Sequence, residues 1–137
     1  MKKIFLALLV AMVLFAGCSN KLKAGVYEAE NVLPDSTAIA KVTIDSDGKI
    51  TDVYFDETYD GSTKKTLGDE YGMKSEWGSQ IGEWYEHVAA LEKAIVDNQG
   101  VETITLTDKG TTDAVSGCTI QVSHLIKAFN DAIAKAK

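Results

Sequence analysis

The chain has 137 residues, of which 45% are hydrophobic and 25% charged, with 11 Gly and one Pro. This composition is that of a globular protein, and the length is enough for one domain. The net charge of -6 excludes nucleic-acid binding, because an acidic chain repels phosphate backbones. Two Cys and two His, far apart in the sequence, exclude a clustered zinc site and a disulfide framework.

Residues 1–17 have the features of a secretory signal. Lys2 and Lys3 precede an uncharged run over residues 4–17 that is dominated by Leu, Val, Phe and Ala. As a helix this run would extend roughly 21 Å, which is shorter than the roughly 30 Å hydrocarbon core of a bilayer. We therefore predict a cleaved lipoprotein export signal rather than a permanent membrane span.

The signal ends in a sequence that resembles the lipobox of bacterial lipoproteins. The resemblance covers residues 14–18, with Phe15 where Leu is usual and Cys18 at the end. It implies that Cys18 becomes the mature N-terminus and carries acyl chains such as palmitate, which anchor the protein to membrane lipid. Residues 18–24 would then be the lipidated Cys and a short tether, and residues 25–137 the folded domain. The resemblance places the protein outside the cytoplasm, at the cell surface or the periplasmic face.

Three β-rich runs follow the tether, at residues 26–29, 39–44 and 50–55. An Asp-Gly pair between the second and third runs is a strong hairpin signal, because both residues tolerate positive φ. We expect an antiparallel meander with one apolar and one wet face. The polar, Gly-punctuated stretch at 56–79 is too irregular for an element, and loops of this length usually carry function or disorder.

Apolar residues at three- and four-residue spacings predict two amphipathic helices, over residues 80–98 and 117–136. Ser79 is a possible cap for the first helix. Between the helices, residues 101–106 alternate in polarity and predict a half-buried strand. The expected fold class is α+β, an antiparallel meander packed with two amphipathic helices in a single compact domain.

Residues 111–119, just before the last predicted helix, could form an anion site. Asp113 and Ser116 are residue types that bond neighbouring amides, and Ser116 stands where an N-cap belongs. Gly117 would let the backbone approach a ligand, and the hydroxyl of Thr119 would lie in the first helical turn beside the positive dipole end. The same pattern also fits a capped helix start without a ligand. The residue types alone therefore do not distinguish an anion site from a helix cap.

A family resemblance favours the anion site, and it is carried by Asp113-Ala114-Val115-Ser116-Gly117-Cys118-Thr119. This segment resembles the Asp-x-x-(Ser/Thr)-Gly-Ala-Thr motif of the FMN-binding domain. That domain occurs in the C subunit of the sodium-translocating NADH:quinone reductase and in the G subunit of the Rnf complex. The resemblance implies that Thr119 carries FMN through a phosphoester made by a separate flavin transferase, and that Asp113, Ser116 and Gly117 form the recognition and phosphate loop. The order of features along the mature chain is similar to that of small FMN-binding lipoproteins.

Cys118 stands where this family has Ala. A Cys is nearly as small and often buried, whereas a thiol at a helix N-terminus would be reactive. We expect Cys118 to be buried beside the cofactor-binding residues. The substitution leaves open whether FMN is held covalently or non-covalently.

A flavin ring needs flat apolar walls, and one irregular stretch offers them. The residues that we predict to form the second wall are Leu67, Tyr71, Gly72, Met73 and Trp77. A small core under a long loop is an equally good interpretation of each residue taken singly. We expect Trp84 and Tyr85 in the core, His87 and His124 as surface or capping groups, and the acidic pairs at 56–57 and 69–70 on solvated faces.

These features predict a non-enzymatic, membrane-anchored flavoprotein that carries FMN as an extracytoplasmic electron carrier. Its partners would be membrane lipid through Cys18, the flavin transferase, and a redox donor and acceptor. No nucleophile and base stand at a spacing that predicts catalytic residues, and no metal site is predicted. Two alternatives remain open: a non-covalent FMN-binding lipoprotein that captures or delivers flavin, and an interaction or antigenic lipoprotein without flavin.

Overall fold

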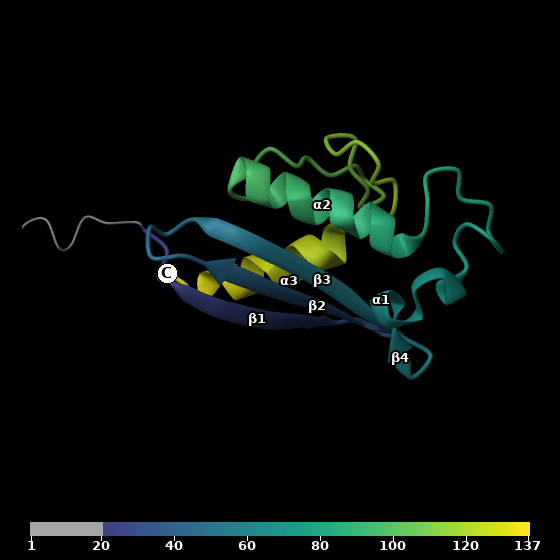
Figure 1. Cartoon of the computed structure of the whole chain (residues 1–137), viewed down its shortest axis with the longest axis horizontal. Helices are drawn as coiled ribbons and strands as arrows, with labels where there is room; N and C mark the ends of the chain where they lie inside the picture. The colour runs from purple at the N-terminus through teal and green to yellow at the C-terminus, as the bar shows by residue number, and fades with distance from the viewer. Residues whose placement is uncertain (1–20) are drawn as a thin grey trace, which may run out of the picture.

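The computed structural model describes residues 21–137, so the predicted export signal and Cys18 lie outside the described residues. Three strands form an antiparallel meander, namely β1 (Gly25–Val32), β2 (Thr37–Ile44) and β3 (Ile50–Tyr59). The two-residue strand β4 (Ser62–Thr63) pairs with the end of β3, which gives the order β1-β2-β3-β4. The predicted meander is therefore confirmed (Figure 1).

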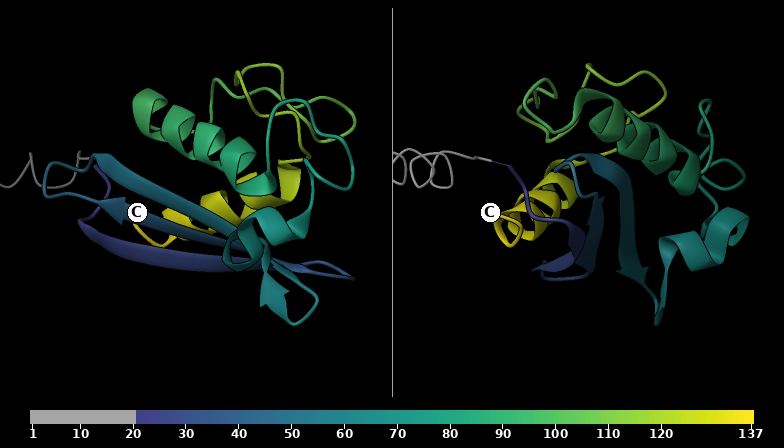
Figure 2. Two further views of the ribbon diagram at one scale, coloured as in Figure 1. Left: turned by 45° about the vertical axis from the view of Figure 1, so that its right-hand side comes forward. Right: turned by 60° about the vertical axis from the view of Figure 1, so that its left-hand side comes forward.

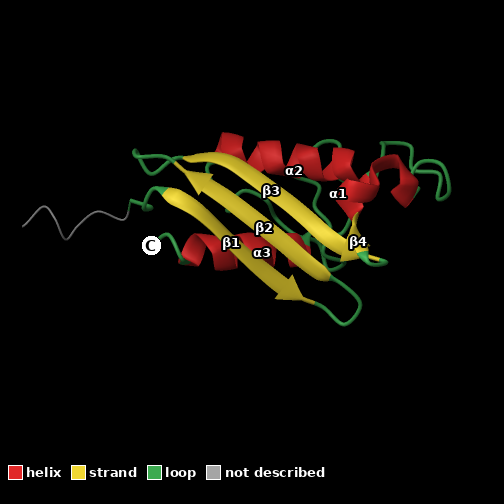
Figure 3. Cartoon of the chain, turned by 60° about the horizontal axis from the view of Figure 1, so that its bottom comes forward, coloured by secondary structure: helices red, strands yellow, loops and turns green. Residues whose placement is uncertain are grey.

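Two long helices cover one face of the sheet. Helix α2 (Trp84–Asn98) packs on β3, and helix α3 (Ser123–Ala134) packs on β1 and β2. Figure 3 views the sheet from its uncovered face, with both helices behind it. A short helix α1 (Lys64–Leu67) and the 3-10 turn η1 (Gly68–Tyr71) follow β4 at one end of the sheet. The α+β class and the single compact domain are confirmed.

The core lies between this sheet face and the two helices. Cross-strand pairs such as Ala40 with Phe55 and Val42 with Val53 point toward the helices and are buried. Leu91 of α2 and Leu125 of α3 meet them and have no exposed surface. Burying each such large apolar side chain stabilises the fold by about 1.5–3 kcal/mol, which fixes the helices on the sheet.

The hairpin between β2 and β3 forms where the Asp-Gly pair predicts it. The Asp45 carboxylate accepts hydrogen bonds from the backbone N–H groups of Asp47 and Lys49, both at 2.9 Å. Gly48 has a φ of +77°, a conformation that L side chains rarely adopt. This turn therefore depends on its Gly.

The predicted strand at 101–106 is wrong. Residues 99–122 form an irregular connection that lies over α2, on the side away from the sheet (Figures 1 and 2). Val101 is half-buried and Ile104 is buried against the core, whereas Leu106 is exposed. A strand needs a hydrogen-bonded neighbour, and this path offers none, so the alternating polarity reflects side-chain burial alone.

The last helix begins later than predicted, at Ser123 instead of residue 117. Ser116 is therefore not its cap, and Thr119 is not in its first turn. The backbone N–H groups of Val122 and Ser123 donate to the carbonyl of Gly110, at 2.8 and 3.1 Å. The residues predicted to form the phosphate loop therefore lie before α3 and not at its N-terminus.

The first long helix also begins later, and the preceding stretch is more ordered than expected. Glu83, not Ser79, is the N-cap of α2, and the Glu83 N–H donates to the Glu86 carboxylate at 2.6 Å. The stretch at 56–79 holds the end of β3, β4, α1 and η1. Within residues 21–137, no helix combines the length and the apolar character needed to cross a bilayer.

Candidate functional site

A cavity of about 250 Å³ opens where β3, α1 and the start of α2 meet the segment before α3. Its lining residues are Glu57, Lys64, Tyr71, Met73, Trp77, Trp84, Ile120, Gln121 and His124. Three aromatic rings and a Met provide flat, apolar walls, and four polar side chains provide hydrogen-bonding groups. Small-molecule pockets of roughly 300–1,000 Å³ have this make-up, so the cavity suits one flat ring rather than a whole cofactor.

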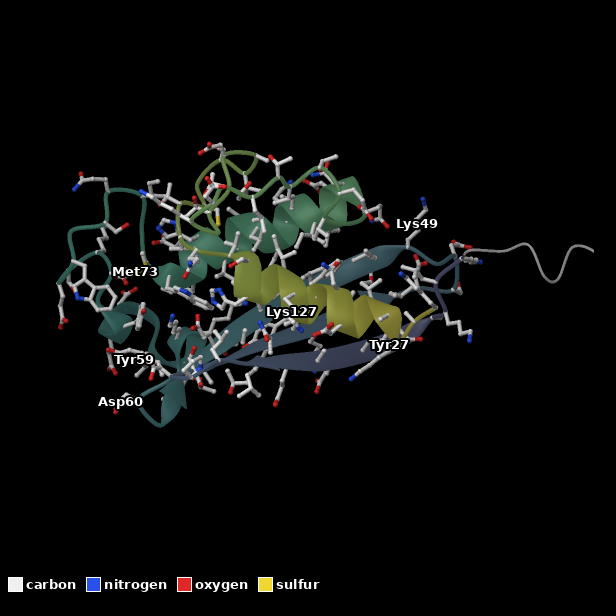
Figure 4. All side chains as sticks on the ribbon, turned by 180° about the vertical axis from the view of Figure 1, so that it is seen from behind. Tyr27, Lys49, Tyr59, Asp60, Met73 and Lys127 are labelled. Atoms are coloured by element: carbon white, nitrogen blue, oxygen red, sulfur yellow. The ribbon has the colours of Figure 1, made fainter. Side chains whose placement is uncertain are left out.

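The wall predicted from the sequence is present in part. Tyr71, Met73 and Trp77 line the cavity, whereas Leu67 and Gly72 belong to the same segment but do not line it. The Tyr71 ring packs edge-to-face against the rings of Tyr59 and Trp77. The distances between ring centroids are 4.9 Å to Tyr59 and 5.0 Å to Trp77. Figure 4 shows Tyr59 and Met73 together at this end of the molecule.

A single buried carboxylate holds this wall in place. The side chain of Glu83 accepts hydrogen bonds from the N–H groups of Met73, at 2.9 Å, and Lys74, at 3.1 Å. Glu83 is only 4% exposed, so these bonds are shielded from water. The start of α2 therefore positions the irregular segment that carries the aromatic side chains.

Thr119 is exposed and directly precedes two residues of the cavity wall, Ile120 and Gln121. Its backbone N–H donates to Nδ1 of His87 at 3.1 Å. Because Nδ1 accepts, Nε2 carries the ring proton, and it lies 3.5 Å from Oγ of Ser79. His87 thus lies between the Thr119 segment and the segment before α2.

The prediction that His87 is a surface or capping group is wrong, because its side chain is fully buried. It belongs to the buried stripe of α2, three residues after Trp84 and four before Leu91. Desolvation lowers the pKa of His87 below 6.5, against opposing effects of a backbone hydrogen bond with Gly82 and the charge of Glu86. The ring is therefore neutral at pH 7.

The motif loop is anchored from within and presents its polar residues outward. Val115 and Cys118 are buried, whereas Asp113, Ser116 and Gly117 are exposed and do not line the cavity. The predicted burial of Cys118 is confirmed at 1% exposure, and burial raises the pKa of its thiol to about 11. The thiol stays protonated and unreactive at neutral pH.

An ionic cluster forms the polar side of the cavity, around Glu57. The prediction that Asp56 and Glu57 lie on a solvated face is wrong, because they are 4% and 6% exposed. Burial alone would raise the pKa of Glu57, but hydrogen bonds from His124, Lys64 and Ser36 outweigh it and lower the pKa to about 2. His124, predicted as a surface or capping group, is a half-buried partner of Glu57.

Asp56 organises the strand end next to this cluster. Its carboxylate accepts hydrogen bonds from the N–H groups of Glu57, at 2.9 Å, and Lys65, at 3.1 Å. It also accepts from the Tyr54 hydroxyl at 2.9 Å. Burial and this bond raise the pKa of Tyr54 to about 12. The second acidic pair, Asp69 and Glu70, is exposed as predicted.

The two aromatic residues at the start of α2 have different environments. Trp84 is in the core as predicted, at 3% exposure, and it also lines the cavity. Tyr85 is only half-buried, so its placement in the core is wrong. Its hydroxyl donates to the Asp69 carboxylate at 2.9 Å, which raises the pKa of Tyr85.

Six lining residues were not predicted as site residues: Glu57, Lys64, Trp84, Ile120, Gln121 and His124. Ile120 and Gln121 could have been found as the residues directly after the motif. The others are brought to the cavity by packing and carry no sequence signal of their own. Two further cavities, of about 440 and 300 Å³, lie near Glu83 and near Phe129, and neither is lined by the motif or the aromatic wall.

A family model for the FMN-binding domain matches residues 36–134. The chain belongs to the FMN-binding domain family. It is therefore a flavin-binding protein, and FMN is its cofactor. The match includes the aromatic cavity and the motif that ends at Thr119. Neither the curated proteins nor the solved structures gave a match.

The residues present fit this cofactor. The rings of Tyr71, Trp77 and Trp84 form apolar walls for a flat ring, and the cavity is too small for the whole FMN molecule. The exposed hydroxyl of Thr119 lies next to the lining residue Ile120, where the ribityl phosphate could extend outward.

Proposed function

We propose that this flavin-binding protein is a membrane-anchored electron carrier outside the cytoplasm, with FMN linked through its phosphate to Thr119. The observation that carries the proposal is the position of Thr119. Its side chain is exposed, its backbone N–H is held by the buried ring of His87, and the next two residues line the aromatic cavity. The hydroxyl is thus open to a modifying enzyme while its backbone is fixed.

The chain's own residues would divide the tasks of holding the cofactor. Tyr71, Trp77 and Trp84 would hold the ring and exclude water from its faces. The exposed Asp113 and Ser116 are accessible to a flavin transferase, as the motif resemblance implies. Bound FMN supplies one- and two-electron transfer, which these side chains cannot perform.

The linkage is tested on the full chain, co-expressed with an active flavin transferase and extracted in mild detergent. We expect the intact mass to rise by one FMN minus water, and the flavin absorbance to survive denaturation. Thr119→Ala should abolish both, whereas the control Thr103→Ala, at an exposed Thr in the same connection, should keep both.

Each other outcome points to a different function. Flavin that is released on denaturation would indicate a non-covalent FMN-binding protein. Protein-linked flavin in Thr119→Ala would overturn the linkage to this residue. If no flavin were bound while the transferase modified a known substrate in the same cells, the interaction or antigenic lipoprotein would be favoured.

The anchor is tested separately, by fractionating cells that express the Cys18→Ser variant. We expect the unmodified chain in the membrane fraction, with a mass that includes the acyl chains, because two or more chains give stable anchoring. Cys18→Ser should lose that added mass. Acyl chains that persist in this variant would overturn the proposed site of lipidation.

A further inference from the structure

The polar side of the cavity is one connected cluster. Glu57 Oε2 accepts from Nζ of Lys64 at 2.8 Å and from Nε2 of His124 at 3.1 Å, and Oε1 accepts from Oγ of Ser36 at 2.8 Å. The side chains of Lys64 and His124 are each 13% exposed, and that of Glu57 is 8% exposed. The carboxylate is therefore covered by three donors, and two of these donors, Lys64 and His124, line the cavity beside it.

Lys64 retains donors that the protein does not use. An ammonium group has three N–H donors, and Glu57 accepts one of them. The other neighbours of Nζ that the described chain provides are the rings of Tyr71 and Trp84, with centroids at 5.1 and 5.3 Å. These two rings line the same cavity. The ammonium thus stands among the aromatic walls with N–H groups to offer a ligand.

We propose that Lys64 binds the carbonyl-bearing edge of the flavin ring and raises its reduction potential, with Glu57 as a positioning residue. The inference rests on the proposed function only in that FMN occupies this cavity. A flavin ring has one apolar edge and one edge of carbonyl and nitrogen acceptors. Lys64 is the one lysine among the described lining residues. We expect the acceptor edge to face Lys64, because a charged ammonium group forms stronger hydrogen bonds than a neutral donor.

The effect on the potential follows from charge. Two electrons and one proton from a reductant leave the acceptor edge with a net negative charge at neutral pH. A nearby ammonium binds that form more tightly than the neutral oxidised form, because the cavity is partly shielded from water. Tighter binding of the reduced form raises the midpoint potential by linkage. For a two-electron couple, a tenfold preference corresponds to about 30 mV.

The test measures the midpoint potential of the FMN-loaded full chain, by titration with dithionite against a reference dye. We expect Lys64→Met to lower the potential by about 30 mV, the equivalent of a tenfold loss of preference for the reduced form. Lys64→Arg should stay close to the unmodified chain, because it keeps the charge. The control Lys127→Met removes an exposed lysine of α3 that pairs with Asp131, and should leave the potential unchanged. Equal potentials for Lys64→Met and the unmodified chain would overturn the proposal.

A double variant separates the charge of Lys64 from that of Glu57. Lys64→Met combined with Glu57→Gln removes both charges, so no uncovered carboxylate is left near the ring. The potential should remain below that of the unmodified chain if Lys64 acts on the flavin directly. Recovery of the original potential would assign the shift to Glu57 and overturn the proposal.

Affinity distinguishes a contact with the ring from a contact with the phosphate. In a Thr119→Ala background, free FMN and riboflavin bind without any covalent link. Lys64→Met should weaken the binding of both by a similar factor, about tenfold. If it weakened FMN alone, Lys64 would be a phosphate contact and the proposal would be wrong.

The two proposals fail in distinguishable ways. Flavin that leaves the unmodified chain on denaturation contradicts the Thr119 link, yet the potentials and affinities still test Lys64. A loaded chain whose potential is insensitive to Lys64→Met contradicts the role of Lys64 alone. If the chain bound neither FMN nor riboflavin, both would be overturned. A thermal melt of each variant shows whether it is folded, and Lys64→Gln, which also removes the charge, repeats the test if the Met variant is not.

Discussion

Three buried polar side chains hold the segments that form the site. Glu83 accepts the N–H groups of the aromatic segment, His87 accepts that of Thr119, and Glu57 holds Lys64. The Glu57 and Glu83 contacts join residues 7 and 10 positions apart, whereas the His87 contact spans 32 positions. A buried donor or acceptor that loses its partner costs about 1–3 kcal/mol, so these side chains support both the fold and the site.

We expect His87→Leu to destabilise the fold by about 1–3 kcal/mol, because the Thr119 N–H loses its acceptor. It should also reduce FMN incorporation at Thr119. His87→Asn keeps an acceptor near the position of Nδ1 and should recover part of the incorporation. Urea unfolding and intact mass measure the two effects, and equal incorporation in the Leu and Asn variants would contradict a role for this bond.

The same residue predicts a loss of stability in acid. The pKa of folded His87 lies below its unfolded value of 6.5, so the folded state resists protonation. Its contribution is complete above pH 6.5 and is lost as the pH falls through the folded pKa. Urea unfolding between pH 7 and 5 should show a decrease that is smaller in His87→Asn. An equal decrease in both chains would contradict the assignment to His87.

Glu57 affects the stability of the fold at lower pH than His87 does. Its pKa falls from 4.5 to about 2 in the folded chain, which corresponds to about 3 kcal/mol of stability at pH 7. This stability is present above pH 4.5 and is lost as the pH falls toward 2. Glu57→Gln should unfold more easily at pH 7 and show a flatter profile between pH 4.5 and 2. An unchanged profile would show that Glu57 does not control acid stability.

Cys118 should behave as a small core residue rather than a reactive thiol. Because it is 1% exposed and its pKa is raised to about 11, iodoacetamide should label it only after denaturation. Peptide mass spectrometry of native and denatured samples measures the labelling. Cys118→Ala restores the family's residue and should leave FMN incorporation unchanged. Labelling of the native chain would contradict this environment.

At the scale of elements, the aromatic segment depends on the start of α2. Met73 and Lys74 are tied to Glu83, and Gly72 has a φ of +85° that favours Gly. The segment is otherwise irregular between η1 and α2, with Trp77 57% exposed. Such a segment can open locally while the rest of the domain stays folded.

Glu83→Ala should therefore loosen this segment more than the whole domain. We expect faster hydrogen exchange at the amides of Met73 and Lys74, with little change at the buried core of β2. The control Glu70→Ala removes an exposed carboxylate from the neighbouring 3-10 turn. Equal exchange at Met73 in the Glu83 and Glu70 variants would show that Glu83 does not hold the segment.

On the scale of the whole molecule, the site lies far from the point where the chain enters the domain. Figure 4 shows Tyr59, Asp60 and Met73 at one end, and Tyr27 and Lys49 toward the end where residue 21 begins. The proposed anchor, Cys18, is three residues before that point. If Cys18 is the anchor, we expect this arrangement to direct the flavin cavity away from the membrane.

Fluorescence of the FMN-free chain in lipid vesicles tests this orientation, because both Trp residues line the cavity. Lipids brominated on their acyl chains should not quench the emission of Trp77 or Trp84. Aqueous acrylamide should quench Trp77, which is 57% exposed, more than Trp84, which is 3% exposed. A Tyr27→Trp control reports from the other end. Strong quenching of Trp77 by the lipid would contradict the orientation.

Short-range patterns in the sequence determined the meander, the Asp-Gly hairpin, the existence of both long helices and the motif that ends at Thr119. These features depend on periodicity, turn chemistry and a contiguous motif, which the chain carries locally. The predictions of a strand at 101–106 and of a helix start near Ser116 were wrong for the same reason. A local pattern does not reveal whether a strand has a hydrogen-bonded neighbour, or at which residue a helix begins.

Only the tertiary structure decided which polar side chains are buried and what they contact. Glu57 contacts Lys64 and also His124, which comes 67 positions after Glu57 in the chain. His87 accepts a hydrogen bond from the backbone of Thr119, which comes 32 positions after His87. Burial and partners arise when α2 and α3 pack on one face of the sheet. The helical period places His87 on the buried stripe of α2, but no periodicity encodes which group it contacts, because that partner arrives only when distant elements pack together.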